Sequence, residues 1–276
     1  MKETVASAAL AGAAANLAAN PLGLPIGSQT YPHRARIKAG DFAGLCADMK
    51  ALGIGSIELC SPGYGEFAGL ADAKQTRKII EDHGLQCPSS HFSLRELRTK
   101  LEPSIEWAKE IGMTQMGTAT LSGHAENGVA TMDVVKHAAD EYNHIAETIS
   151  KAGLTTFLHD ERFEMSKVDG KLVYQVLIEL LDPKLVKMQF QMSATPTVGD
   201  PVMYFKKYPG RFISAHLQGV DLNAPPQSPA VAVGKDGLDW PKIFKAAKKG
   251  GMKNYFIEQT WDLTVQGVAY LKTLKV

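Results

Sequence analysis

The chain has 276 residues, of which 45% are hydrophobic and 21% charged, so it holds enough apolar material for a large core. The formal net charge is +1 and the sequence contains no basic run, which argues against nucleic acid and anionic membrane as partners. The three cysteines are odd in number and follow no metal-binding spacing, so we expect ordinary buried thiols and no disulfide framework.

The first 22 residues, which begin MKETVASAALAGAAANLAAN, form an alanine-rich extension. This segment is too weakly hydrophobic to span a membrane. It resembles the apolar part of a bacterial export signal, with small residues around a cleavage point at 18–20, which would place the mature protein in the periplasm or outside the cell. The alternative is an alanine-rich helix that caps the domain of a cytoplasmic protein. We therefore divide the chain into an extension at 1–22 and one domain at 23–276.

Within the domain, short apolar runs alternate with longer amphipathic ones. The patterns predict strands at 26–31, 56–60, 87–92, 115–121, 154–159, 186–192, 211–217 and 254–258. They predict helices at 41–53, 71–83, 102–111, 132–152, 171–181, 200–208, 239–250 and 263–274. Local signals agree with these boundaries, because Gly84 ends one helix and Asp239 can cap another.

Eight strands that are each followed by a helix, at a period of about 30 residues, predict a parallel sheet. In this length, the pattern favours an α/β protein with a closed (β/α)8 barrel, the TIM barrel, as a single domain. No Gly-x-Gly-x-x-Gly motif follows any predicted strand, so a dinucleotide-binding fold is not favoured. Active sites of such barrels lie at the C-terminal ends of the strands, and the residues there are the candidates for function.

Ionisable and amide side chains follow the predicted strands at this end. They are Glu58, His91, His159, Glu161, Glu164, Gln191, His216 and Glu258. Burial of such groups is costly unless they are paired, hydrogen-bonded or bound to a metal. Carboxylates and imidazoles that converge on one cavity are typical of a divalent-metal site, and this set would suit Mn, Zn, Co or Mg.

Each of these residues also has a structural interpretation. His216 could be a buried histidine that bonds to the backbone, although Glu258, at the end of the apolar run YFI, needs a partner in any case. Glu161 is either a ligand or a loop carboxylate. Glu58 and His91 either line the pocket or make structural hydrogen bonds at the rim of the barrel.

Four runs of sequence resemble one known family. They are FLHDERFE (157–164), YPGRFISAHLQG (208–219), VAVGKDGLDWPKIF (231–244) and NYFIEQTWD (254–262). In this order and on these barrel elements, they resemble the sugar phosphate isomerase/epimerase superfamily, which has the xylose isomerase-like TIM barrel. The resemblance extends from about residue 23 to the end of the chain. It implies an enzyme that moves a proton next to a carbonyl of a sugar, with one divalent metal that polarises the carbonyl.

The resemblance also implies the metal ligands. They would be Glu161 after the fifth strand, Gln191 on the sixth, His216 on the seventh and Glu258 on the eighth, with Glu164 as the alternative to Glu161. Glu161 and Glu258 would also carry the proton. The family has an aspartate where this chain has Gln191, and a Lys-Asp pair where it has Gln218 and Gly219. An amide oxygen can ligate a hard cation without adding charge, so we expect weaker metal binding in a nearly unchanged cavity.

The remaining expected contacts are with the substrate. We expect His159 to assist catalysis by orienting a hydroxyl group. The side chains expected to bind the substrate are Glu58, His91, Glu164, Lys235 and Trp261. Lys235 belongs to the long loop 219–237, which follows the seventh strand and is placed to cover the pocket.

The leading hypothesis is a metal-dependent isomerase or epimerase of a small, unphosphorylated carbohydrate. One alternative is a lyase that acts on a 3-keto-glycoside by β-elimination, and another is a non-catalytic sugar-binding barrel that has lost its metal. An endonuclease of abasic DNA is disfavoured, because the sequence shows no basic face for DNA. The sequence leaves open whether the chain forms a homo-oligomer.

Overall fold

Eight parallel strands form a closed barrel in the computed structural model, which describes residues 20–125, 129–225 and 228–276. The strands are β1 (Gly27–Gln29), β2 (Ser56–Cys60), β3 (Gln86–His91), β4 (Gln115–Thr118), β5 (Thr155–Leu158), β8 (Val186–Gln191), β9 (Phe212–Leu217) and β10 (Phe256–Ile257). They follow one another around the barrel in chain order, and β10 pairs with β1 to close it. The single-domain TIM barrel predicted from the sequence is therefore confirmed.

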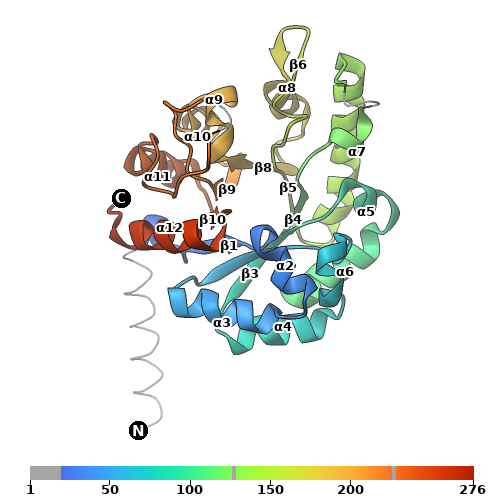
Figure 1. Ribbon diagram of the computed structural model, residues 1–276. Helices are drawn as coiled ribbons and strands as arrows, with labels where there is room; N and C mark the ends of the chain where they lie inside the picture. Colours follow the sequence, from blue (N-terminus) through green and yellow to red (C-terminus); the bar gives the residue numbers. More distant parts are fainter. Residues whose placement is uncertain (1–19, 126–128, 226–227) are drawn as a thin grey trace.

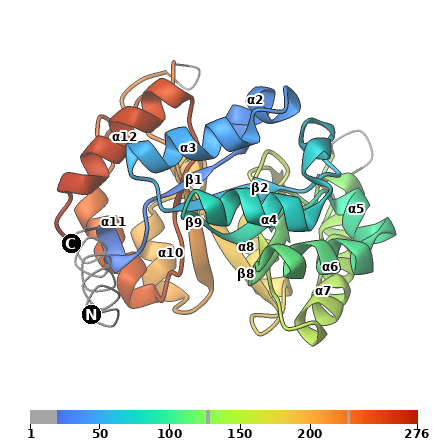
Figure 2. The ribbon, with the colours of Figure 1, turned by 90° about the horizontal axis from the view of Figure 1, so that it is seen from below.

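The helices surround the strands (Figure 1). The principal ones are α3 (Phe42–Leu52), α4 (Ala73–Asp82), α6 (Leu101–Ile111), α7 (Met132–Lys151), α8 (Val173–Leu180), α10 (Pro201–Lys207), α11 (Trp240–Gly250) and α12 (Trp261–Thr273). The Asp239 side chain accepts a hydrogen bond from the backbone N–H of Lys242 at 3.0 Å, so it caps α11 as predicted. The last helix, α12, lies beside α3 (Figure 2). Lys272 Nζ of α12 donates a hydrogen bond to the carbonyl of Leu52 in α3 at 2.7 Å.

Several short elements were not predicted. They are the 3₁₀ turns η1 (Pro21–Gly23), η2 (Tyr31–His33), η3 (Gly65–Leu70), η4 (Ser122–His124) and η6 (Met192–Ala194), the helices α2 (Arg34–Lys38), α5 (Leu94–Thr99) and α9 (Thr195–Val198), and the hairpin strands β6 (Lys167–Val168) and β7 (Lys171–Leu172). These elements are too short to show a periodicity. Apart from η1, they lie in the segments that follow the barrel strands, so they shape the mouth of the barrel. The β6–β7 pairing also explains why α8 begins at Val173 rather than at residue 171.

Aromatic packing fixes the strands that carry two of the candidate residues. Phe190 on β8 and Phe212 on β9 lie with ring centroids 6.1 Å apart, and Phe205 of α10 lies 5.5 Å from Phe212. All three side chains are buried. In the register that this packing supports, Gln191 pairs with His216, so the ends of β8 and β9 present both side chains at the same level.

The predicted extension lies, up to residue 19, outside the described residues, and η1 covers Pro21–Gly23. Within the ranges that the structure describes, none of the helices is both long and apolar enough to cross a membrane.

Close packing of β4 against β5 leaves no room for a side chain at Gly117. A Cβ atom there would lie 2.1 Å from the carbonyl oxygen of Phe157 and 2.7 Å from its ring. We expect Gly117→Ala to lower the free energy of unfolding by about 1–3 kcal/mol, because the barrel wall must shift to accept the methyl group. Urea denaturation measures this change. Gly69→Ala is the matched control, since no atom of the described residues lies within 4 Å of a Cβ there. Equal stability of the two variants would contradict the prediction.

Candidate active site

Glu58 is a fully buried carboxylate at the end of the barrel. Its Oε1 accepts hydrogen bonds from Gln29 Nε2 at 2.9 Å and His216 Nε2 at 2.5 Å, and its Oε2 accepts from Ser89 Oγ at 2.6 Å and Gln189 Nε2 at 2.9 Å. Burial alone would raise the pKa of Glu58, but the charges of His91 and His216 and their hydrogen bonds hold it well below its usual range. Glu58 is therefore a fixed anion.

His216 lies between two carboxylates. Its Nε2 faces Glu58 as described, and its Nδ1 lies 3.1 Å from Glu258 Oε2. The side chain is fully buried, which favours the neutral ring, but the charges of Glu258 and Glu58 overcome this effect and raise the pKa of His216 to about 10. Glu58, His216 and Glu258 thus form a continuous row, which we call the carboxylate–histidine row.

Glu258 ends the row on the cavity side. Its Oε2 accepts hydrogen bonds from Gln191 Nε2 at 2.9 Å and Gln218 Nε2 at 2.8 Å, besides its contact with His216. Burial alone would raise the pKa of Glu258. The charge of His216 and these hydrogen bonds outweigh burial and lower the pKa to about 2. Gln191 and Gln218 therefore both donate to the same carboxylate oxygen.

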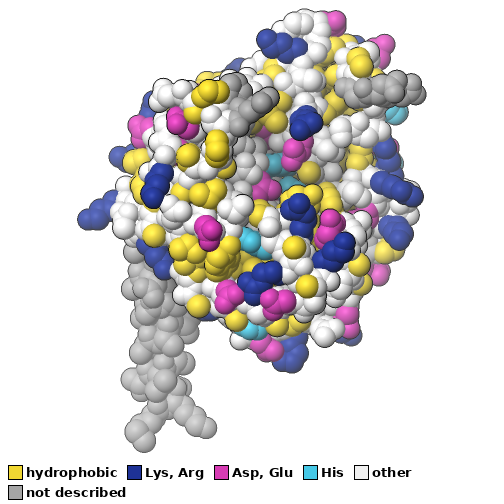
Figure 3. Space-filling view, viewed as in Figure 1, with side chains coloured by type: hydrophobic (Ala, Val, Ile, Leu, Met, Phe, Trp, Pro, Cys, Tyr) yellow, Lys and Arg dark blue, Asp and Glu magenta, His cyan; other side chains and the backbone are white. Residues whose placement is uncertain are grey.

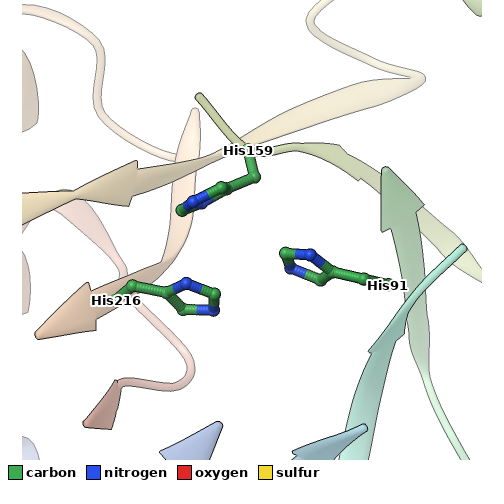
Figure 4. A group of neighbouring side chains, drawn as sticks. All are labelled: His91, His159 and His216. Carbon is green, nitrogen blue, oxygen red and sulfur yellow. The ribbon is translucent and has the colours of Figure 1, made fainter. Parts of the chain in front are cut away.

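Three histidines from different strands gather around the row. Figure 4 shows His91, His159 and His216 with their rings turned toward one another. Their ligand atoms lie within 4.8 Å of one another, so the triad could hold a metal ion. His91 Nε2 contacts Gln189 Oε1 at 2.7 Å. Neither ring nitrogen of His159 has a hydrogen-bond partner within the described residues, and burial together with the charges of His216 and His91 holds its pKa well below the usual range.

The two acidic residues after β5 have different surroundings. Glu164 is fully buried and accepts hydrogen bonds from the backbone N–H of Leu121 at 2.7 Å, from Thr120 Oγ1 at 2.9 Å and from the backbone N–H of Glu161 at 3.1 Å. Burial raises the pKa of Glu164 to about 7. Glu161 is exposed at the cavity wall, and loss of water around the carboxyl and the charge of Glu258 raise its pKa. Of the two, Glu161 is the carboxylate that lines a cavity.

Two cavities adjoin at this end of the barrel. The first, of about 370 Å³, includes His91, His159, Tyr64 and Phe163 in its wall, and we call it the histidine cavity. The second, of about 500 Å³, includes Gln191, Gln218 and Gln259, and we call it the glutamine cavity. Both walls contain Tyr31, Glu161 and Glu258. Figure 3 shows a hollow in the middle of one face, with histidine and acidic side chains in its depth.

The structure thus brings together eight of the ten residues singled out from the sequence. One of the eight, Glu164, connects two loops through its hydrogen bonds. Lys235 and Trp261 lie apart from both cavity walls. Lys235 Nζ donates to Gln266 Oε1 at 2.8 Å, and the Trp261 ring packs edge-on against His33 with centroids 5.6 Å apart.

Sequence reasoning assigned no role to Gln29, Ser89 and Gln189, the three residues that share Glu58 with His216. The position of Gln189 in the sequence could have identified it as a residue of the site. It lies two residues before Gln191 on the same strand, so the period-two alternation of a strand places both side chains on one face.

No family model and no curated protein matches the chain. Solved structures do match it. A sugar phosphate isomerase/epimerase from Parabacteroides distasonis has a TM-score of 0.73 at 21% identity, over 91% of this chain and 96% of that chain. L-ribulose 3-epimerase has a TM-score of 0.67 at 17% identity, over 90% of this chain and 91% of the other. At these identities, the similarity shows the fold. The xylose isomerase-like barrel expected from the sequence is confirmed.

A third similar structure is a xylose isomerase-like TIM barrel protein from Mycobacterium smegmatis in complex with magnesium. It has a TM-score of 0.67 at 14% identity, over 90% of this chain and 95% of that chain. An AP endonuclease of family 2 from Brucella melitensis has the same fold, with a TM-score of 0.61 at 12% identity over 92% of this chain and 100% of its own. The fold alone therefore does not distinguish between these activities.

The carboxylate–histidine row predicts that substitutions of Glu58 and of its neighbour Ser89 lower the free energy of unfolding by unequal amounts. We expect Glu58→Gln to lower the free energy of unfolding by about 3–5 kcal/mol, because it leaves the buried His216 without one of its two anionic partners. Ser89→Ala removes one neutral donor from the same carboxylate and should cost about 1 kcal/mol. Urea denaturation of both variants tests this. Similar costs for the two would contradict a charged row.

Proposed function

We propose that this protein is an enzyme that moves a proton next to a carbonyl of a sugar or sugar derivative, as an isomerase or epimerase does. The observation that carries the proposal is the pair Glu161 and Glu258, which line the same two cavities with pKa values shifted in opposite directions. Two acids whose surroundings separate their pKa values are typical of acid–base catalysis. The fold of the similar structures supports the same chemistry.

In this proposal, Glu161 is the base. Its raised pKa makes it the better proton acceptor of the pair, and it takes the proton from the carbon beside the carbonyl. Return of that proton to the neighbouring carbon, together with movement of the hydroxyl proton to the former carbonyl oxygen, gives isomerisation. Delivery of a proton from water to the opposite face of the same carbon, beside the charged Glu258, gives epimerisation. Both reactions need a ligand that touches the two carboxylates at once.

Other residues of the histidine cavity have positioning roles in the proposal. His159 has two buried nitrogens without partners in the described chain, so its neutral ring has one N–H to donate and one nitrogen to accept, as a sugar hydroxyl requires. Tyr64 and Phe163 supply an apolar wall that limits water around the reacting carbon.

The residues present also fit a divalent cation. Glu58 holds Nε2 of His216, so a cation that displaced the proton from the other nitrogen would find the ring already oriented. That other nitrogen, Nδ1, lies next to Glu258 Oε2, and Gln191 Oε1 is buried without a partner among the described residues. We propose that His216, Glu258, Gln191 and Glu161 hold one cation of the Mn, Zn, Co or Mg type. A cation there would polarise the carbonyl of the substrate.

The first prediction from this function concerns Glu161. In deuterated water with a panel of free aldoses and ketoses, we expect the wild-type protein to exchange the proton beside the carbonyl, as followed by proton NMR. Glu161→Gln should slow this exchange by about 10²–10⁴-fold, because it removes the base. The wild-type rate should fall as the pH drops through the pKa of Glu161, with a midpoint above the ordinary value of 4.5, since the base must be deprotonated.

Glu147→Gln is the matched control for Glu161→Gln. Glu147 is an exposed carboxylate on α7 that lines neither cavity, so its loss should leave the exchange rate unchanged. Equal exchange by wild type and Glu161→Gln would contradict the role of Glu161 as the base.

The second prediction concerns the cation. After incubation with Mn and Zn and removal of the excess, plasma mass spectrometry should find one equivalent per chain in the wild type and none in His216→Ala. Gln191→Asp should bind the cation more tightly than the wild type, because it adds an anion to the ligand set. His33→Ala removes a buried histidine that lines neither cavity and should leave the stoichiometry unchanged.

Absence of metal from both the wild type and Gln191→Asp would rule out the cation and favour the alternative of a non-catalytic sugar-binding barrel. His216→Ala removes a buried charge partner and can unfold the protein, so loss of metal in this variant is not decisive by itself. Gln191→Asp is expected to bind the cation more tightly, so it tests the site independently.

A further inference from the structure

The histidine and glutamine cavities meet at a boundary formed by Tyr31, Glu161 and Glu258. We propose that the substrate is a sugar that carries a ring-sized neutral substituent, such as a disaccharide or another glycoside, and that it occupies both cavities at once. This inference rests on the proposed function for its reacting end, because it is Glu161 and Glu258 that place the reacting carbon at the boundary.

The position of the two carboxylates is the first argument. Both belong to the walls of both cavities, so a ligand that touches them lies where the cavities join. A single small sugar at this boundary would leave a large part of one cavity to water. A ligand with two parts would fill both and would bury more of its surface, as ligands in functional pockets usually do.

The sizes of the cavities are the second argument. The volumes of about 370 Å³ and about 500 Å³ each lie within the range of pockets that bind one small ligand. Neither cavity is a minor extension of the other. Two pockets of similar size beside one pair of acid–base residues suit a ligand of two similar units.

The chemistry of the glutamine cavity is the third argument. Its wall combines the apolar side chains Met165 and Leu263 with the neutral polar groups of Ser193, Gln191 and Gln218. Such a mixture of apolar surface and neutral hydrogen-bonding groups suits a second sugar ring, which has hydroxyl groups at its edge and C–H groups on its faces.

The cations near the cavities do not favour a phosphate as the substituent. In the described part of the chain, the positively charged residues of the two walls are Arg34 and Arg162. Arg34 is held against Tyr31, because its Nη1 donates to the Tyr31 carbonyl at 3.0 Å and its guanidinium carbon lies 4.4 Å from the centre of the Tyr31 ring. The wall of the glutamine cavity also holds the carboxylates of Glu161 and Glu258, so a neutral substituent fits it better than an anionic one.

Tyr31 provides the fourth argument. It is 39% exposed, which is high for a large aromatic side chain at a cavity boundary. Its ring is nonetheless held in place, since it stacks on Phe67 at a centroid distance of 6.5 Å and meets the edge of Tyr64 at 6.4 Å. An exposed aromatic side chain that neighbouring rings and Arg34 keep in one orientation is preorganised to bind a ligand that crosses the boundary.

Isothermal titration calorimetry tests the proposal with four probes, glucose and galactose as single sugars and cellobiose and lactose as disaccharides. We expect the disaccharides to bind at least about tenfold more tightly than the single sugars. Leu263→Trp, which narrows the glutamine cavity, should bring this ratio of affinities close to one. Ala119→Leu, which narrows the histidine cavity, should weaken binding of all four probes.

Ser150→Trp adds the same bulk as Leu263→Trp at an exposed position of α7 that lines neither cavity, and it should leave all four affinities unchanged. Disaccharides that bind no more tightly than single sugars, or not at all, would overturn the proposal. So would a ratio that Leu263→Trp leaves unchanged.

The same proteins separate failure of this inference from failure of the proposed function. Proton exchange on single sugars, together with a ratio of affinities near one in the wild type, would refute the two-part substrate and leave the function intact. Tight disaccharide binding that Leu263→Trp abolishes, without proton exchange on any of the four probes, would refute the function and leave the class of ligand intact.

Discussion

The arrangement of the site depends on the cost of burying two carboxylates and one imidazole in a row at the end of the barrel. The positive charge of His216 is shared between the negative charges of Glu58 and Glu258, and neutral donors stabilise both carboxylates further. Gln29, Ser89 and Gln189 donate to Glu58, and Gln191 and Gln218 donate to Glu258. These donors come from or directly follow β1, β3, β8 and β9, so the row is stable only where a closed barrel holds the strand ends in register.

This constraint gives a physical reason for Gln191. An aspartate at this position would place a further carboxylate beside Glu258 and His216, and only a tightly bound cation could offset the repulsion. The amide instead turns an N–H toward Glu258 Oε2 and leaves Oε1 without a partner among the residues that the structure describes. The site can therefore persist with or without a cation, whereas a set of three acidic ligands would require one. Gln218 has the same effect from the next strand, which makes the two substitutions parts of one adjustment of charge.

Much of the fold could be predicted because each strand is a short apolar run before a recognisable helix. The ligand candidates Gln191, His216 and Glu258 could also be predicted, since the C-terminal ends of barrel strands converge. The hydrogen bond from Gln189 to Glu58 could not, because it crosses the barrel between residues 131 positions apart. The role of Glu164 was hidden for a similar reason, since its partner Leu121 belongs to the loop after another strand. The local sequence pattern indicates which face of a strand a residue occupies. It does not indicate which residue lies opposite across the barrel.

The proposed division of roles between Glu161 and Glu258 follows from how each is attached. Glu258 directly follows a buried strand, and three N–H donors hold its Oε2, so it keeps its charge. Glu161 lies on the loop after β5, and its backbone N–H is tied to Glu164, which is tied in turn to the loop after β4. The backbone of Glu161 is thus fixed while its carboxyl is exposed at the cavity wall beside a permanent anion. Loss of water around the carboxyl and the charge of that anion together raise the pKa of Glu161, so its surroundings suit the proposed role as the base.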